Sequence, residues 1–233
     1  MRKGLSLVLI AGALLADTIV HAQEPVGPSE LEQSLGRPRR VPAIPAELRP
    51  MFRGVTRDRL IVRSLRGNEI AIDIGDFEPE NFRQYGDGRF LGFAFMGYEF
   101  YGYRLVDRRM TGEAAVIETG EAPVFSPDGR YFAAVQLSGA AFGGLEGLGI
   151  WEVRADGTAQ ILFSDVLPPG EEWRIDGWPR ADCVSVSAIG RQAAEGEPPP
   201  ARRHFGVEVG ETLRLLASYE SPGCNATDAT ADG

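Results

Sequence analysis

Two cysteines, Cys183 and Cys224, are the residues of this chain whose type and spacing most directly suggest chemistry, since they are the only cysteines among 233 residues. Their separation of 41 residues and the absence of a Cys-x-x-Cys motif argue against a redox or metal-binding pair. An even pair of cysteines is typical of a structural disulfide in an oxidising compartment. We therefore predict a Cys183–Cys224 disulfide, which would stabilise the fold by roughly 4 kcal/mol through loop closure in the unfolded chain.

Histidine is equally scarce, with only His21 and His204 in the chain. His21 belongs to a segment that we expect to be removed as a signal peptide, so a Ser-His-Asp triad would have to use His204. One histidine cannot build a metal site of two or three histidines, and a Cys/His zinc site would need both cysteines reduced. His204 lies beside Arg202 and Arg203 at the start of a predicted strand, where a surface role is more typical. We predict no catalytic, cofactor-binding or metal-binding residue.

Carboxylates are the remaining candidates for catalysis. The predicted end of one strand carries an acidic run, and a second acidic pair follows much later: Asp73, Asp76, Glu78 and Glu80, then Glu171 and Glu172. Paired carboxylates can hydrolyse glycosides or hold calcium at a defined separation in space. The first run lacks the spacing of an EF-hand loop, and acidic turns at strand ends are usually solvated. A carboxylate-based hydrolase acting on a glycan or envelope polymer is therefore the alternative function.

Aromatic and arginine side chains near loops are better candidates, because these types dominate binding hot spots. Two such groups lie near predicted turns: Trp173, Trp178 and Arg180, and Tyr98, Tyr101 and Tyr103. We take Trp173, Trp178 and Arg180 as candidate partner-binding residues. The alternative for each residue is that it fills space between adjacent sheets.

The start of the chain predicts export. Arg2 and Lys3 precede a run of twelve mainly apolar residues from Leu5 to Ala16, and Val20-His21-Ala22 forms a small-residue cleavage pattern. This is typical of a secretory signal peptide over residues 1–22, and the apolar run is too short to span a bilayer. We expect a periplasmic or secreted protein without a membrane span after cleavage.

Charge excludes several classes of partner. Loss of residues 1–22 removes Arg2, Lys3 and Asp17 and leaves 22 basic and 32 acidic residues, a net charge of −10. An acidic protein is a poor nonspecific ligand for nucleic acid or anionic membranes. Lys3 is the only lysine, so the Gly-rich stretch 138–149 lacks the lysine of a Walker-type nucleotide site. We predict no cofactor and expect a protein or envelope component as partner, with the oligomeric state open.

Residues 23–57 are interpreted as a Pro-rich arm, since six prolines lie between positions 23 and 50. Within the arm, Ser29 and Glu32 could form the capping box of a short helix. Residues 218–233 are interpreted as a C-terminal tail. Between the arm and the tail, residues 58–217 show almost continuous strand signal.

A repeated hairpin organises residues 58–217. The stretch APVFSPDGRYFAAVQL (122–137) predicts a strand, a type I turn around Pro127 and Gly129, and a second strand. FRQYGDGRFLGFAFM (82–96) and IDGWPRADCVSVSAI (175–189) resemble it, and each copy precedes another predicted hairpin. The pair LIVRSL and EIAIDI comes first and lacks its own first hairpin. Half a unit followed by three units of four strands is typical of propeller blades.

The run FSPDGRYFA followed by GIWEVRADGTAQIL resembles the TolB-type β-propeller repeat, in which an FSPDG turn joins the first two strands of a blade. The match is good over residues 122–164 and partial in the neighbouring units. The resemblance implies an all-β fold of about three and a half antiparallel, four-stranded, propeller-like blades. It adds no catalytic group, and it favours a non-catalytic binding or scaffold protein of the cell envelope.

Overall fold

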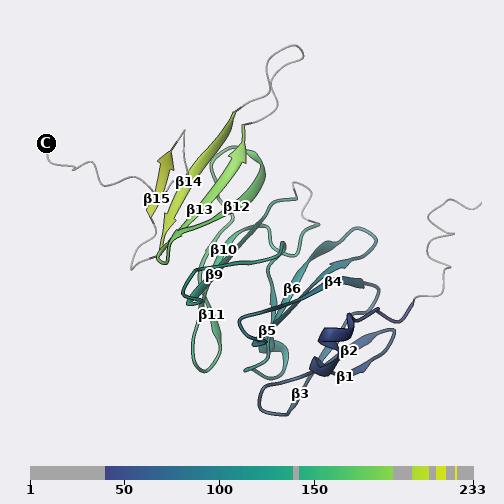
Figure 1. Cartoon of the computed structure of the whole chain (residues 1–233). Coiled ribbons are helices and arrows are strands. Elements are labelled where there is room, and N and C mark those ends of the chain that lie inside the picture. Colours follow the sequence, from purple (N-terminus) through teal and green to yellow (C-terminus); the bar gives the residue numbers. More distant parts are fainter. Residues whose placement is uncertain (1–39, 139–141, 191–200, 210–213, 219–223, 225–233) are drawn as a thin grey trace, which may run out of the picture. The chain divides into compact units, whose positions relative to one another are not determined.

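The computed structural model describes residues 40–138, 142–190, 201–209 and 214–218, together with Cys224 (Figure 1). The predicted signal peptide, most of the predicted arm and most of the predicted tail lie outside these residues. The chain divides into a unit of residues 1–39 and a unit of residues 40–233, and only the second is described below. None of the described helices is long and apolar enough to cross a membrane.

The described chain folds into four antiparallel sheets that follow one another in sequence. The 3₁₀-helix η1 (Ala46–Met51) leads into the first sheet, which contains β1 (Phe52–Val55), β2 (Arg59–Arg63) and β3 (Glu69–Asp73). The second sheet contains β4 (Glu78–Tyr85), β5 (Phe90–Met96), β6 (Tyr101–Asp107) and β7 (Val116–Glu118), with the 3₁₀-helix η2 (Glu113–Ala115) before β7. The third contains β8 (Val124–Phe125), β9 (Tyr131–Gln136), β10 (Gly147–Val153) and β11 (Thr158–Ser164). The fourth contains β12 (Glu171–Arg180), β13 (Cys183–Ile189), β14 (Arg202–Glu208) and β15 (Arg214–Ser218).

This arrangement confirms the predicted fold class, an all-β protein of four-stranded, propeller-like sheets. One boundary differs from the prediction, because β1 lies inside the segment assigned to the arm. Phe52 of β1 is buried and pairs with Val62 of β2, so the ordered fold begins before position 58. The first unit is therefore a three-stranded sheet instead of a lone hairpin.

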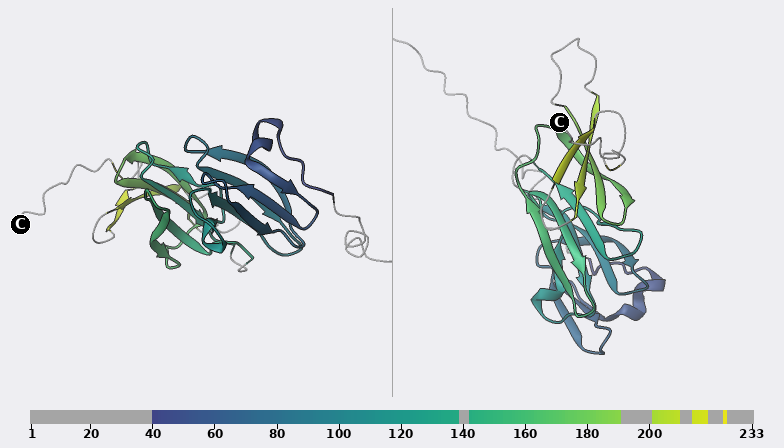
Figure 2. Two further views of the ribbon diagram at one scale, coloured as in Figure 1. Left: turned by 90° about the horizontal axis from the view of Figure 1, so that it is seen from below. Right: turned by 90° about the vertical axis from the view of Figure 1, so that its left-hand side faces the viewer.

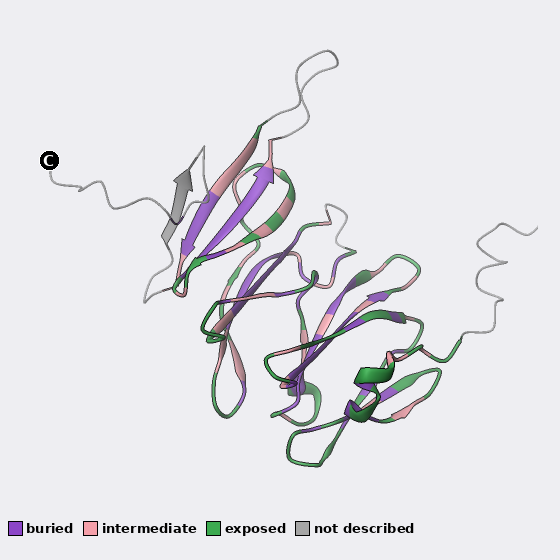
Figure 3. Ribbon diagram, viewed as in Figure 1, coloured by how far each residue is buried: buried purple, intermediate pink, exposed green. Residues whose placement is uncertain are grey.

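Alternating side chains decide which faces of the sheets are buried. In β2 and β3, Leu60, Val62, Ile70 and Ile72 are buried, while the residues between them are mostly exposed (Figure 3). The buried face packs on the second sheet, through residues that include Phe93 of β5. A strand with one buried and one solvated face has this period of two.

The sheets follow one another along the described chain (Figure 2), and three apolar clusters hold neighbouring sheets together in pairs. The first joins the first and second sheets, the cluster around Phe132 and Trp151 joins the second and third, and the cluster around Val184 and Val186 joins the third and fourth. Among the described residues, no apolar cluster joins the fourth sheet to the first. Each sheet therefore depends on its neighbours in the sequence for burial of its apolar faces.

The FSPDG turn adopts the predicted geometry. Gly129 has φ of +69°, and its N–H donates to the carbonyl oxygen of Ser126 at 2.9 Å. The Asp128 carboxylate accepts from the Ser126 hydroxyl and from the Arg130 N–H at 2.7 and 3.0 Å. These two hydrogen bonds lower the pKa of Asp128. The turn has a structural role, because the Ser126 and Asp128 side chains form their hydrogen bonds within it.

The arginine of the earlier Asp-Gly-Arg sequence, Arg89, has a different role from Arg130. The guanidinium of Arg89 pairs with the carboxylate of Asp107, whose side chain is completely buried, and it also donates to the carbonyl oxygen of Gly157 in the third sheet. Asp107 accepts from the hydroxyl of Thr158 as well. The Arg130 side chain stays exposed over the Tyr131 ring. Arg89 thus links the second sheet to the turn between β10 and β11 of the third, whereas Arg130 makes no such link.

Candidate binding site

One end of the second, third and fourth sheets carries the candidate site, and we call it the loop end. It comprises residues 96–101, the described residues of the connection between β9 and β10 (137, 138 and 142–147), the connection 119–123 between β7 and β8, and the start of β12. A parallel bridge between Tyr101 and Gly143 joins the first two segments. A Cβ atom on Gly120 would lie 2.5 Å from the Gln136 side chain, which brings the connection 119–123 against β9.

Large apolar side chains are exposed together at the loop end. We call this set the apolar patch: Met96, Tyr98, Tyr101, Leu137 and Phe142. Met96 and Tyr101 pair across the β5–β6 hairpin, and the Tyr101 N–H donates to the carbonyl oxygen of Phe142 at 3.1 Å. Tyr98 is 66% exposed and Met96 is 59% exposed. Exposed apolar side chains that gather at one place on a protein commonly mark an interaction site.

The described part of the Gly-rich connection is held in place by one carboxylate. Glu146 accepts hydrogen bonds from the Ser138 N–H at 3.1 Å, from the Ser138 hydroxyl and from the Gly143 N–H at 2.8 Å. Burial raises the pKa of Glu146, but these hydrogen bonds outweigh it and the pKa is lowered. The Ser138 hydroxyl in turn accepts from the N–H of Phe142. This network fixes the backbone that presents Phe142.

A cavity of about 450 Å³ lies beside the apolar patch, between β12 and the third sheet. We call it the β12 pocket. Val124, Val135, Ile175 and Trp173 are among the residues that line it. The Trp173 ring stacks on Phe205 with centroids 5.4 Å apart. Its Nε1–H is buried and has no hydrogen-bond acceptor among the described residues.

The polar lining of the β12 pocket comes from three segments: Glu121 before β8, Glu172 and Arg174 on β12, and Arg202 on β14. Arg202 donates to the Glu172 carboxylate at 3.3 Å and to the Glu172 carbonyl oxygen at 3.1 Å. Burial raises the pKa of Glu121. The sequence predicted Trp173 as a candidate but not Glu121 or Arg202, which reach the pocket from other sheets or strands.

A carboxylate behind the pocket holds one of its arginines. Asp176 accepts from the Arg174 guanidinium at 3.0 Å and from the Ser187 hydroxyl at 2.8 Å, and its second oxygen lies 2.9 Å from Nδ1 of His204. Burial raises the pKa of Asp176, but the hydrogen bonds from Ser187, His204 and Arg174 outweigh it and the pKa is lowered. The Arg202 guanidinium also donates to Ser187 at 3.3 Å. The network positions both arginines of the pocket.

These residues include a serine, a histidine and an aspartate, but in the wrong order for a nucleophilic triad. The Ser187 hydroxyl donates to Asp176, whereas a triad requires the histidine to lie between the serine and the carboxylate. Among the described residues, no group of three His, Cys, Asp or Glu side chains is placed to hold a metal ion. The geometry of this cluster suits binding better than hydrolysis.

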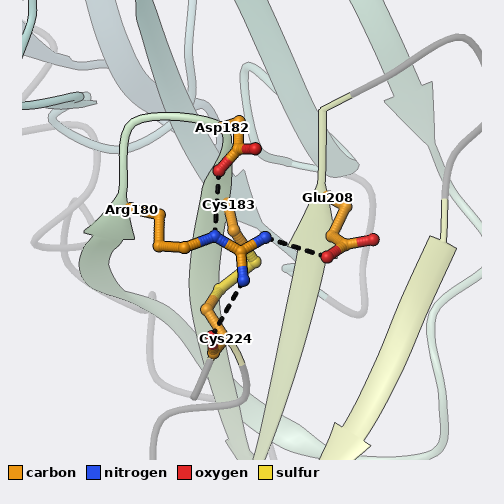
Figure 4. Close-up of a disulfide and its surroundings, with 5 residues drawn as sticks. All are labelled: Arg180, Asp182, Cys183, Glu208 and Cys224. Carbon is orange, nitrogen blue, oxygen red and sulfur yellow. Dashed lines mark hydrogen bonds and ion pairs between the residues drawn. A yellow bond between two sulfur atoms is a disulfide. The ribbon is translucent and has the colours of Figure 1, made fainter. Parts of the chain in front are cut away.

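The other two candidates, Trp178 and Arg180, lie at the opposite end of β12. Trp178 is 8% exposed, and its Nε1–H donates to the carbonyl oxygen of Val124 at 2.9 Å. Arg180 donates to Asp182, to Glu208 and to the carbonyl oxygen of Cys224 at 3.0, 2.9 and 3.3 Å (Figure 4). The predicted Cys183–Cys224 disulfide is formed beside it. The structure therefore separates Trp173 from Trp178 and Arg180.

The remaining predicted groups lie elsewhere. Asp73 ends β3 and pairs with Arg59 at 2.7 Å, and both side chains are exposed. Glu78 and Glu80 are exposed on β4. Tyr103 is buried and shares a 2.8 Å hydrogen bond with the hydroxyl of Tyr85, so it does not belong to the apolar patch. Burial raises the pKa of Tyr103.

No protein-family model and no curated protein matches this chain. Solved structures similar to it include the hydrazine synthase of Kuenenia stuttgartiensis, at 15% identity and a TM-score of 0.40, covering 70% of this chain and 49% of that one. A second is a protein described as a 6-phosphogluconolactonase from Bacteroides fragilis, at 11% identity and a TM-score of 0.38, covering 69% of this chain and 51% of that one. This chain spans about half the length of each. The TolB-type resemblance stays a prediction, and the antiparallel all-β architecture that it implies is observed.

Proposed function

We propose that this protein is an exported, non-catalytic binding protein of the cell envelope that recognises a protein partner through the apolar patch. The observation that carries the proposal is the gathering of five large exposed apolar side chains at the loop end. Aromatic residues and methionine are enriched in protein–protein interfaces. The segments of the patch are joined by backbone hydrogen bonds, such as that from Tyr101 to Phe142, so the partner would meet a preformed surface.

Export is supported by two independent features. The first is the basic, apolar and small-residue pattern of residues 1–22. The second is the Cys183–Cys224 disulfide, a bond typical of proteins in oxidising compartments. A net charge of −9 for the whole chain favours a protein partner over nucleic acid.

Site-specific photocrosslinking in the native cells tests the proposal. A photoreactive amino acid replaces Tyr98 in one variant, Phe142 in a second and Leu65 in a third. Leu65 is a matched control, since it is 48% exposed, lies between β2 and β3, and donates its N–H to the carbonyl oxygen of Arg108, at the other end of β6 from Tyr101. We expect the same crosslinked protein from positions 98 and 142 and none from position 65. Equal products from all three positions, or none from positions 98 and 142, would contradict the proposal.

A further inference from the structure

Hydrogen-bond donors dominate the polar lining of the β12 pocket. The indole N–H of Trp173 is buried without an acceptor, which is a costly state for a polar group. Arg174 and Arg202 add two guanidinium groups, with five N–H donors each. The Nε–H of Arg174 donates to Asp176, and the Arg174 side chain is 60% exposed. A ligand for this pocket must supply acceptors.

Two carboxyl groups line the same pocket, and neither satisfies the Trp173 indole. Glu172 is 71% exposed, and its carboxylate lies 3.3 Å from the Arg202 guanidinium. Glu121 comes from the other wall, and burial raises its pKa. The contact between Glu172 and Arg202 demonstrates that a carboxylate can approach the guanidinium from the solvent side.

We propose that the β12 pocket binds a carboxylate group of the partner polypeptide, with the Arg202 and Arg174 guanidinium groups as its donors and the Trp173 ring as part of its wall. This inference rests on the proposed function, since Val135 of β9 lines the pocket and Leu137, which follows β9, belongs to the apolar patch. A carboxylate provides the planar pair of acceptors that guanidinium groups bind best. It would compete with Glu172 for Arg202.

Other ligand classes fit the pocket less well. A cation would face two guanidinium groups. A doubly charged phosphate would need more positive charge than the pocket has to spare, because Arg174 and Arg202 are each paired with a carboxylate, Asp176 and Glu172. A single carboxylate exchanges one for one with Glu172. The charges that line the β12 pocket therefore favour a monovalent anion as its ligand.

The indole resonances of the protein provide a direct test. The chain has three tryptophans, and a proton–nitrogen NMR spectrum of the folded protein should contain one indole N–H signal from each. Trp178 serves as an internal control, since its N–H is already bonded to Val124. The probes are N-acetyl-leucine, its amide, N-acetyl-glutamic acid α-amide and inorganic phosphate. Substitution Trp173→Phe assigns the signal.

We expect N-acetyl-leucine or N-acetyl-glutamic acid α-amide to shift the Trp173 signal in a saturable manner, and the uncharged leucine amide to leave it in place. The carboxylate that binds more tightly identifies the source, a chain terminus or an acidic side chain. Arg202→Gln should weaken the affinity about tenfold or more, and Glu172→Gln should strengthen it. Arg154→Gln is the matched control, since Arg154 is an exposed arginine paired with Glu152 away from the pocket.

Three results would overturn the carboxylate assignment: no shift with either carboxylate, an equal shift with the amide, or tighter binding of phosphate. The crosslinking experiment distinguishes a failure of the carboxylate site from a failure of the proposed function. If position 98 crosslinks a partner but the Trp173 signal does not shift with either carboxylate, the carboxylate site is wrong and the proposed protein partner stands. If the pocket binds carboxylates but positions 98 and 142 crosslink nothing, the proposed protein partner is lost and the carboxylate site stands.

Discussion

The two ends of β12 carry the same kinds of residue and use them differently. At one end, Trp178 is buried, and its indole N–H has an acceptor in the third sheet. At the other end, Trp173 is only partly buried, and its indole N–H is enclosed without an acceptor. Each tryptophan has an arginine close by in the sequence. Arg180 is held by three groups, whereas Arg174 is held by one and is largely exposed.

This contrast shows that residue type alone does not separate a structural site from a binding site. The hydrogen bonds of Trp178 and Arg180 are made within the fold, and Arg180 also binds the carbonyl oxygen of a disulfide-bonded cysteine (Figure 4). The donors around Trp173 exceed the acceptors that the fold supplies. Of the two arginines, Arg174 is therefore the one whose guanidinium is more available to a partner.

The largest expected difference between the two ends concerns the disulfide. Replacing both Cys183 and Cys224 by serine should lower the free energy of unfolding by about 2–4 kcal/mol, since the loop of 41 residues is no longer closed in the unfolded chain. Urea denaturation measures the loss. The Trp173 indole should keep its NMR position in the variant, because the disulfide lies at the other end of β12. A shifted Trp173 signal in a folded variant would show that the two ends are coupled.

The two tryptophans themselves give the next largest effect. Trp178→Phe should cost about 1–3 kcal/mol, because it removes a buried hydrogen bond and leaves the carbonyl oxygen of Val124 without its donor. Trp173→Phe should cost less than about 1 kcal/mol, since no hydrogen bond is lost and a phenyl ring can still stack on Phe205. Urea denaturation of both variants gives the comparison. Equal losses would mean that the unpaired indole contributes as much to folding as the paired one.

Much of the fold could be predicted because strands and turns are local features. Alternating apolar residues indicated β2 and β3, and Asp-Gly turns indicated the hairpins around Gly88 and Gly129. The strand β1 escaped prediction, since its four residues lie just after Pro50 and their burial depends on pairing with β2. The pairing of Arg89 with Asp107 was not predicted either, because the two residues are 18 positions apart and meet only across a strand pair.

The candidate site depends on contacts that no local pattern encodes. Trp173 and Trp178 are five residues apart, which would place them on opposite faces of a regular strand. Both contact the same apolar cluster, because the register of β12 against β13 shifts between Ile175 and Gly177 and again before Arg180. Tyr98 and Tyr101 were among the predicted aromatic residues, but Phe142 joins them only through the bridge between segments 96–101 and 137–147.

The smallest expected effect concerns the carboxylate that holds Arg174. Because the pKa of Asp176 is lowered in the folded protein, its charged form stabilises the fold above the pKa of an unfolded aspartate, about 3.9, and this contribution is lost as the pH falls through the folded value. Asp176→Asn should therefore cost about 1 kcal/mol at pH 7, and the difference from the wild type should shrink as the pH falls below about 3.9. Urea denaturation across this pH range measures it.

Two further variants separate the contributions around Asp176. Asp156→Asn is the matched control, since Asp156 is an exposed aspartate in the turn between β10 and β11, and it should cost nothing at any pH. His204→Gln removes the imidazole that faces the second oxygen of Asp176 and leaves Arg174 in place. If the difference between the wild type and Asp176→Asn persisted undiminished at pH 2.5, charge would not be what holds Arg174. The Trp173 end of β12 would then be fixed by packing, unlike the Trp178 end, where Trp178 and Arg180 make hydrogen bonds within the fold.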